Sequence, residues 1–299
     1  MLSTCLQLVV ILLLMLLLVF VTGLAILIHR TAHPARSMAM KAGAPEHPFD
    51  LDWPCEELQL QGCHGNLLKA WLVARKEPKA LLILLHGHRK DKRQMLERSG
   101  FLYSAGYALL FLDHRHHGES EDAAFGLGYF GRLDLARVIE EMRRREAYGS
   151  CRIFTFGISL GASTALAAAC DGLDISAVIA DSPSSDQSRT LVEYAQRLYC
   201  LPEGFTLFAL SLVERWWSMD FEKMNLFARL SGSSVPVLII HSEKDARVPI
   251  SHARRLAGLK RQAPLELLTF SEGGHGMAQI LHREVYERKV LEFLEARDS

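Results

Sequence analysis

The sequence has no excess of charge of either sign. Lys and Arg together number 34, and so do Asp and Glu, in a chain of 299 residues. A nucleic-acid-binding surface needs a basic excess concentrated on one face, so the balance argues against nucleic acid and favours a small-molecule or lipid-like partner. The chain has no internal repeat and no low-complexity tract. Its 49% apolar and 23% charged residues are typical of a globular domain with a sizeable core.

Charged side chains are absent from residues 1–28, where Leu, Ile, Val, Met and Phe dominate. At about 1.5 Å per residue such a run spans a hydrocarbon layer roughly 30 Å thick. A cleaved signal peptide, the alternative, usually carries Lys or Arg before an apolar stretch of only about 7–15 residues. We therefore predict a single-pass transmembrane anchor. Basic residues follow the run, which favours a cytoplasmic domain by the positive-inside rule but leaves the side of the membrane open.

The five cysteines after this run have no metal-ligand spacing, and we expect neither a metal nor a cofactor. Cys151 and Cys170 lie in apolar stretches and are predicted to be buried thiols. Only Cys55 and Cys63 lie close enough in the chain to pair across a hairpin, and whether they do so stays open.

Beyond a linker predicted at residues 29–50, short apolar runs alternate with helical patterns, which is typical of an α/β fold with a mostly parallel sheet. Residues 56–61 and 67–74 are predicted to form an opening hairpin. The other predicted strands, whose unbroken apolar runs suit burial on both faces, are residues 80–85, 108–112, 153–156, 177–180, 235–240 and 265–270. The predicted helices are residues 92–105, 133–148, 160–170, 251–259 and 277–296.

The alternation fails once, between about residues 183 and 233, where no strand is predicted. Amphipathic stretches at 190–199 and 207–217 indicate helices instead. The segment is rich in aromatic side chains, namely Phe205, Phe208, Trp216, Trp217 and Phe221. It is either a helical pair packed on the core or a short helical cap that forms an acyl or aromatic pocket over an active site.

The pentapeptide Gly157-Ile-Ser159-Leu-Gly161 stands between a predicted strand and a helix of small residues. A nucleophile elbow requires this context, because a sharp strand-to-helix turn lifts the serine above the sheet. Glycines at 157 and 161 remove side chains that would clash in the turn. Ser159 is therefore the candidate nucleophile, and a βα loop of small residues is the alternative interpretation.

A serine hydroxyl needs a base to take its proton. His275, flanked by glycines after the last predicted strand, is the candidate base. Asp245, just past the strand at 235–240, is the candidate acid that orients it, with Glu243 and Asp181 as rivals. The order serine, acid, histidine is that of α/β-hydrolases and of neither common protease type.

An oxyanion hole is the remaining requirement of this chemistry. The segment Leu85-His86-Gly87-His88 ends a predicted strand. We predict that the backbone amides of His88 and Leu160 bind the developing oxyanion, and removing one such donor typically costs about 2.7–4 kcal/mol of transition-state stabilisation.

These segments resemble the α/β-hydrolase superfamily across about residues 55–296, most closely its serine aminopeptidase-like and dienelactone hydrolase-like members, including hydrolases with an N-terminal anchor. The motifs that carry the resemblance are Leu85-His86-Gly87, residues 113–120, the Ser159 elbow, residues 245–249 and Gly274-His275-Gly276. The resemblance implies an α/β-hydrolase domain over residues 51–299, with an eight-stranded sheet flanked by helices. The sequence departs from the usual pattern at His116 and Ser242, where glycine is common.

Two further clusters have a plain interpretation and a functional one. Asp113, His114, His116 and His117 are expected to brace the catalytic turns rather than bind a metal, because they lie in a loop without helical ligand spacing. The basic run at residues 88–93 is expected to be a solvated loop, although it also suits an anionic substrate.

The sequence therefore predicts a serine hydrolase that cleaves an ester or thioester through an acyl-enzyme on Ser159. Two alternatives stay open. One is a serine aminopeptidase-like amide hydrolase, and the other is a catalytically silent, membrane-anchored binding or scaffold protein.

Overall fold

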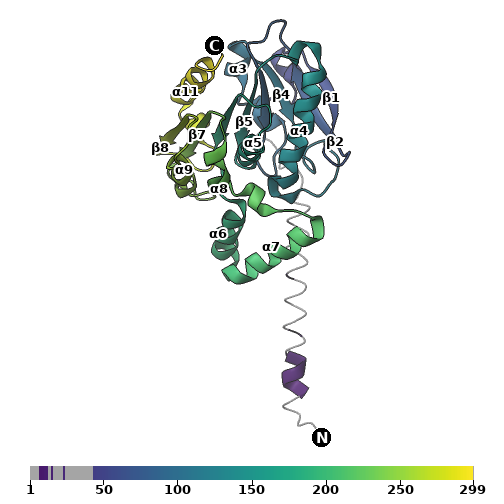
Figure 1. The fold of residues 1–299 in the computed structure, drawn as a ribbon, viewed down its shortest axis with the longest axis vertical. Coiled ribbons are helices and arrows are strands. Elements are labelled where there is room, and N and C mark those ends of the chain that lie inside the picture. The colour runs from purple at the N-terminus through teal and green to yellow at the C-terminus, as the bar shows by residue number, and fades with distance from the viewer. Residues whose placement is uncertain (1–6, 13–14, 16–22, 24–42, 299) are drawn as a thin grey trace.

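The computed structural model describes residues 7–12, 15, 23 and 43–298, and its centre is an eight-stranded sheet (Figure 1). The strand order is β1-β2-β4-β3-β5-β6-β7-β8. β2 pairs antiparallel with β1 and β4, and all other neighbours are parallel. The strands are β1 (Glu56–Gln61), β2 (Leu67–Val73), β3 (Leu81–Leu85), β4 (Ala108–Leu112), β5 (Ile153–Ile158), β6 (Ala177–Asp181), β7 (Val237–Ser242) and β8 (Leu265–Phe270). The predicted mostly parallel sheet is confirmed.

Burial on both faces explains why unbroken apolar runs in the sequence predict these strands. Every residue of β3 to β7 is buried, since helices cover both faces of the sheet. The main differences are at strand ends. β5, β6 and β7 each continue one or two residues beyond the prediction, to Ile158, Asp181 and Ser242, because the added residues still pair with the neighbouring strand. β7 begins only at Val237.

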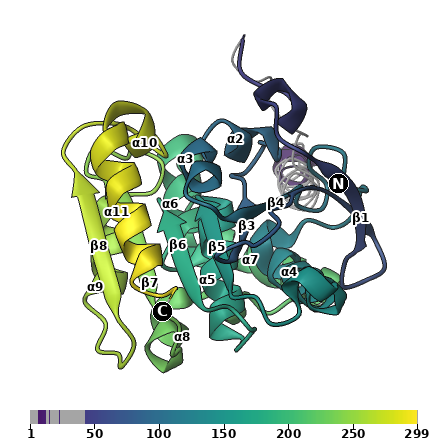
Figure 2. The same cartoon turned by 90° about the horizontal axis from the view of Figure 1, so that it is seen from above.

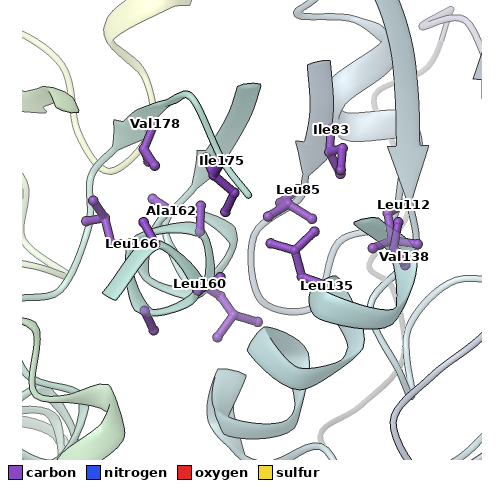
Figure 3. Packing of buried hydrophobic residues seen from close by; sticks show 14 of the residues in the cluster. Ile83, Leu85, Leu112, Leu135, Val138, Leu160, Ala162, Leu166, Ile175 and Val178 are labelled. Carbon is purple, nitrogen blue, oxygen red and sulfur yellow. The ribbon is translucent and has the colours of Figure 1, made fainter. Parts of the chain in front are cut away.

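Two apolar layers lie on opposite faces of the sheet (Figure 2). The first layer contains α4 (Tyr129–Arg144), α5 (Leu160–Cys170), α8 (Leu226–Arg229) and α9 (Ile250–Ala257). The second contains α2 (Arg93–Leu96), α3 (Gly100–Ser104), α10 (Ala278–Leu281) and α11 (Arg283–Glu295). Figure 3 shows Leu135 and Leu160, from α4 and α5, beside Leu85 at the end of β3. This packing holds the start of α5 against the end of β3.

Two predicted helices are wrong in their continuity. The segment predicted as one helix over residues 92–105 forms α2 and α3, separated at Ser99, whose backbone is not helical. The helix predicted over residues 277–296 is broken at His282, with φ −131° and ψ 44°. The helix predicted at 133–148 begins earlier and ends at Arg144, because Arg145 is extended; a 3-10 turn, η3 (Glu146–Tyr148), follows.

The segment between β6 and β7 is helical, as predicted. It contains α6 (Gln187–Tyr199), α7 (Glu203–Trp217), η4 (Phe221–Met224), α8 and η5 (Leu230–Gly232). Asp186 caps α6 by accepting a hydrogen bond from the amide of Arg189. Figure 1 shows α6 and α7 projecting from the body of the domain. The remaining 3-10 turns are η1 (Pro48–Leu51) and η2 (Gly126–Gly128).

The predicted anchor at residues 1–28 lies mostly outside the described residues. Within the described ranges, no helix is both long and apolar enough to cross a membrane. The linker predicted at 29–50 is described only from residue 43, where η1 begins at Pro48 and the ring of His47 lies 4.7 Å from that of Trp71.

Cys55 and Cys63 do not form a disulfide, which answers the question left open by the sequence. They precede and follow the same strand, β1, and six strand residues span about 20 Å, far beyond the roughly 7 Å limit on the Cα separation in a disulfide. Burial raises the pKa of the Cys55 thiol to about 11 and also raises the pKa of the Cys63 thiol.

Candidate active site

The candidate nucleophile stands on a strained turn between β5 and α5. Ser159 has φ +56° and ψ −111°, a conformation that residues other than glycine rarely adopt. Its amide donates a hydrogen bond to the carbonyl of Asp181 at 2.7 Å, which ties the turn to the neighbouring strand. The side chain is half-buried, at the carboxyl end of the parallel strands. A strained serine at this place is the geometry that a nucleophile elbow requires.

Both glycines of the pentapeptide are required by close backbone approach. A Cβ on Gly157 would lie 2.3 Å from the carbonyl carbon of Gly161, and a Cβ on Gly161 would lie 2.2 Å from the carbonyl oxygen of Leu85. Real Cβ atoms do not come so near to backbone atoms. The turn therefore depends on glycine at both positions, as the sequence predicted.

His275 and Asp245 lie next to Ser159 in the predicted order. The Nε2 atom of His275 is 2.7 Å from the Oγ atom of Ser159, and its Nδ1 atom is 2.7 Å from the Oδ2 atom of Asp245. Glycines with positive φ stand near the histidine, at Gly273 and Gly276, and allow the tight loop after β8. The structure thus brings together three side chains that are up to 116 positions apart in the sequence.

The surroundings of Asp245 favour its charged form. Its Oδ1 atom accepts hydrogen bonds from the amides of Arg247 and Val248, at 2.8 and 3.0 Å. Burial acts to raise the pKa of Asp245, but the hydrogen bond and charge of His275, together with the two amides, outweigh it and lower that pKa. An ionised Asp245 orients the imidazole and stabilises its positive form.

The two alternative acids, Asp181 and Glu243, bond to groups other than His275. Asp181 accepts a hydrogen bond from the hydroxyl of Ser182 on one oxygen and from the hydroxyl of Tyr286 on the other, at 2.8 and 2.9 Å. Glu243 is exposed and forms an ion pair with Arg254 at 2.9 Å. Neither is a hydrogen-bond partner of His275.

The turn after β3 lies beside the nucleophile. A Cβ on Gly87 would be 3.7 Å from the Cβ of Ser159. The amide of Gly87 already donates to the Oε1 atom of Gln94 at 2.8 Å. Among the described residues, the amides of His88 and Leu160 donate to no acceptor. They are free to bind an oxyanion, which is the role that the sequence assigned to them.

The histidine cluster braces this turn. The amide of His114 donates to Nε2 of His86 at 3.1 Å, and the amide of Arg89 donates to Nε2 of His117 at 3.2 Å. His86 and His114 are buried, and burial lowers the pKa of both imidazoles, that of His114 to about 3. No group of three or more His, Cys, Asp or Glu side chains in the described part of the chain is arranged to hold a metal ion.

The basic run at residues 88–93 is only partly the solvated loop that the sequence predicted. Lys92 is buried and forms ion pairs with Asp113, at 2.6 Å, and with Glu119. Its ammonium group also lies 4.5 Å from the ring centre of Trp71. This pair compensates the charge of Asp113, which is fully buried beside the turn after β3.

Sequence reasoning missed several positioning contacts. The buried guanidinium of Arg98 donates to the carbonyl of Gly276 at 2.8 Å, directly after the candidate base. The buried imidazole of His241 lies 3.5 Å from Oδ2 of Asp245 and contacts the carbonyl oxygen of Val248. No motif marks either residue, because their partners are backbone groups or residues distant in the sequence.

The insertion between β6 and β7 packs near the site. Arg197 of α6 donates a hydrogen bond to the carbonyl of Ala246, in the loop that carries Asp245. Gly128 lies against both Leu160 of α5 and Met224 of η4. The insertion therefore contacts the acid loop directly and lies beside the start of the nucleophile helix.

Comparisons with known proteins identify similar sequences. A model of the prolyl oligopeptidase family matches residues 102–297. The chain is 28% identical over 244 residues to YqkD, an uncharacterised protein of Bacillus subtilis, with 79% of this chain and 78% of that protein covered.

Solved structures share the fold. The esterase Pf2001 of Pyrococcus furiosus matches with a TM-score of 0.69 and 22% identity, over 89% of this chain and all of that chain. The acylaminoacyl peptidase of Pyrococcus horikoshii matches with a TM-score of 0.61 and 19% identity, over 82% of this chain and 42% of that one. The eight-stranded sheet with flanking helices is that of the α/β-hydrolase superfamily.

Proposed function

This chain belongs to the prolyl oligopeptidase family and is a hydrolase of ester or amide bonds, and we propose that Ser159, His275 and Asp245 are its catalytic triad. The observation that carries the proposal is the unbroken pair of 2.7 Å contacts from Ser159 through His275 to Asp245. The strained elbow at Ser159 and the lowered pKa of Asp245 support the same assignment.

Acylation begins when Ser159 attacks the substrate carbonyl carbon and its proton passes to Nε2 of His275. Asp245 stabilises the imidazolium that forms. The negative oxygen of the tetrahedral intermediate accepts hydrogen bonds from the amides of His88 and Leu160. His275 then gives its proton to the leaving alcohol or thiol, and the carbonyl of the acyl-enzyme re-forms.

Deacylation repeats the sequence with water as the nucleophile. His275 takes a proton from water, which attacks the acyl-enzyme, and then returns a proton to Oγ of Ser159 as the carboxylic acid leaves. No further group is needed for either step, because all proton transfers run between the substrate, Ser159, His275 and water.

The substrate that we propose is an ester or thioester, with the aromatic insertion between β6 and β7 forming a cap near the acyl group. An amide substrate is the second candidate, favoured by the family description and by the acylaminoacyl peptidase among the similar structures. A series of p-nitrophenyl esters of increasing chain length, measured beside aminoacyl p-nitroanilides, separates the two. Higher kcat/KM on the anilides would reject the ester proposal.

The catalytic assignment is tested by labelling with a fluorophosphonate probe. We expect wild type to label and Ser159→Ala not to label, with Ser251→Ala as a control because Ser251 is exposed on α9. If wild type does not react, the chain acts instead as a binding or scaffold protein. Equal labelling of wild type and Ser159→Ala would place the nucleophile elsewhere.

We further propose that residues 1–28 anchor the protein in a membrane with the hydrolase domain on the cytoplasmic side. The uncharged, apolar character of the run supports the anchor, and the basic residues after it support the orientation. Extraction of membranes with alkaline carbonate tests the anchor, since an integral protein stays in the pellet. Protease protection in sealed vesicles tests the orientation.

A further inference from the structure

The side chain of Arg197 joins the insertion between β6 and β7 to the loop that carries Asp245. Arg197 lies on α6, and one terminal nitrogen of its guanidinium donates a hydrogen bond to the carbonyl of Ala246. The other terminal nitrogen lies 3.5 Å from the carbonyl oxygen of Arg247. These two carbonyls follow the candidate acid directly in the chain, so one side chain of the insertion spans the acid loop.

The same two peptide units donate hydrogen bonds to Asp245. The carbonyl of Ala246 and the amide of Arg247 belong to one peptide unit, and that amide donates to Oδ1 of Asp245 at 2.8 Å. The carbonyl of Arg247 and the amide of Val248 belong to the next unit, whose amide donates to the same oxygen at 3.0 Å. Each peptide unit therefore stands between a guanidinium cation and a carboxylate anion. Hydrogen bonds in such a chain polarise one another, and a cation at the carbonyl strengthens the amide as a donor.

Contacts with the body of the domain hold α6 in place. Glu193, one turn before Arg197 and on the same face of α6, lies 3.1 Å from Nε2 of His252 on α9. His252 is buried, and its Nδ1 atom lies 2.9 Å from Oγ of Ser185, near the start of the insertion. One face of α6 thus contacts α9 through Glu193 and the acid loop through Arg197.

The acid loop, Asp245 and His275 separate Arg197 from the nucleophile. Oδ1 of Asp245 faces the two amides, whereas Oδ2 faces Nδ1 of His275 at 2.7 Å. A carboxylate that is held on both oxygens keeps the direction of its bond to the imidazole. Misplacing a catalytic group by about 1 Å can cost a factor of about 10² in rate. The contacts of Arg197 therefore bear on the placement of the acid.

We propose that Arg197 is a positioning residue for Asp245, which makes the insertion part of the catalytic machinery and not only a cap over the acyl group. The inference rests on the proposed triad, because Arg197 acts through Asp245. A cap alone affects the substrates that fill it, and those with long acyl chains most. A positioning residue affects the proton transfer itself, and therefore the shortest ester as much as the longest.

Replacing Arg197 by Met removes the guanidinium from an exposed position. With p-nitrophenyl acetate we expect kcat to fall by about tenfold and KM to stay within about twofold. The same factor in kcat is expected with p-nitrophenyl decanoate. Arg197→Lys should recover only part of the loss, because one ammonium group does not reproduce the two separated donors of the guanidinium.

Arg215→Met is the matched control. It removes the same group from an exposed position on α7, in the same insertion, and should leave kcat unchanged. Titrating the reactive serine with the fluorophosphonate probe gives kcat per active molecule, so that an unfolded fraction does not enter the comparison. A loss in kcat that is confined to the decanoate would show that Arg197 serves the acyl pocket, and would overturn the proposal.

A double-mutant cycle tests whether the effect passes through Asp245. In the Asp245→Asn background, Arg197→Met is expected to lower kcat by less than about twofold, since the carboxylate that Arg197 positions is already absent. A tenfold loss in that background would show that Arg197 acts by another route. If Asp245→Asn leaves kcat unchanged, the triad assignment itself fails. If Asp245→Asn lowers kcat and Arg197→Met does not, the triad stands and only the role of Arg197 is rejected.

Discussion

Asp181 ends β6 and Asp245 lies in the loop after β7, and their hydrogen bonds give the two aspartates different roles. Both oxygens of Asp181 accept hydroxyl donors, from Ser182 and Tyr286, whereas Oδ2 of Asp245 faces Nδ1 of His275. The sequence placed both carboxylates at the right edge of the sheet. The sequence alone could not show which of the two carboxylates pairs with His275. The partners of Asp181 are the next residue and a residue of a helix about a hundred positions later, and no local pattern indicates them.

Replacing Asp245 by Asn should be the more damaging change for catalysis. An amide in place of the carboxylate turns an acceptor toward Nδ1 into a possible donor and favours the wrong tautomer of His275, so we expect kcat to fall by about 10³–10⁴-fold. Asp181→Asn should mainly lower the melting temperature, with kcat reduced far less. Turnover of p-nitrophenyl acetate with both variants checks this ranking, and the reverse order would disprove the role of Asp245.

His116 stands where the α/β-hydrolase pattern that this segment resembles commonly has glycine, and the backbone of His116 accounts for such a preference. The residue has φ +61°, in the left-handed region. At most positions a variant with Ala is more stable than one with Gly, because Gly loses more backbone entropy on folding. Here we expect His116→Gly to exceed His116→Ala in free energy of unfolding by about 1 kcal/mol, because both remove the same side chain and only glycine adopts this φ without strain.

Urea denaturation of the two variants measures that difference directly. The comparison cancels the loss of the hydrogen bond between His116 and Asp122, which both substitutions remove. Equal stabilities, or a more stable Ala variant, would show that the loop changes conformation when the imidazole is removed.

At the scale of elements, strands were predicted more reliably than helix continuity. β3 and β4 are unbroken apolar runs because both faces are covered, so their composition alone identifies them. The segment from Lys92 to Ala105 is rich in helix-forming residues but contains the pair Ser99-Gly100, at which helices commonly break. It divides there into α2 and α3, and Lys92 and Arg98 bond to Asp113 and to the loop after His275, contacts that local sequence does not show.

Arg98 lies at the break between α2 and α3, and its role in positioning the loop of His275 can be tested. Arg98 donates to the carbonyl of Gly276, and Nε2 of Gln279 donates to the carbonyl of Arg98, so the two segments hold each other. We expect Arg98→Met to lower kcat by about tenfold or more, since loosening the histidine loop by even 1 Å weakens proton transfer. KM should change little.

Steady-state kinetics on a short soluble ester give kcat and KM separately. The matched control is Arg288→Met on α11, because Arg288 is exposed and only loosely paired with Glu292. A fall in kcat for the control, or an unchanged kcat for Arg98→Met, would mean that Arg98 does not position the catalytic loop.

For the whole molecule, topology explains why the site could be predicted at all. In a parallel sheet the carboxyl ends of the strands share one edge, so β3, β5, β7 and β8 bring Gly87, Ser159, Asp245 and His275 together once their order is known. The same reasoning cannot place the insertion. α6 and α7 follow β6 at that edge, but their orientation depends on contacts such as that of Arg197 with Ala246.

The buried histidines beneath this edge make the stability of the whole domain sensitive to acid. Burial and neighbouring histidines lower the pKa of His86 well below its ordinary value and the pKa of His114 to about 3. In the unfolded chain both take up protons as the pH falls through about 6.5, whereas in the folded chain His114 does so only near pH 3 and His86 only well below its ordinary pKa. Unfolding therefore binds protons between these values, and the free energy of unfolding falls with falling pH.

Each such histidine contributes a slope of up to about 1.4 kcal/mol per pH unit in that window. The raised pKa of Asp113 acts in the opposite direction, so the total slope is smaller than the sum over the histidines.

Comparing wild type with a single-histidine variant isolates the contribution of that histidine to the slope. His114→Leu should reduce the slope by about 1.4 kcal/mol per pH unit between pH 6 and pH 4. At neutral pH it should lower stability by about 1 kcal/mol, because it removes the hydrogen bond between the His114 imidazole and the backbone of His86, while Nε2 is buried without a partner among the described residues. Urea midpoints measured across this pH range provide the slopes, and an unchanged slope in His114→Leu would show that this imidazole is already protonated in the folded domain.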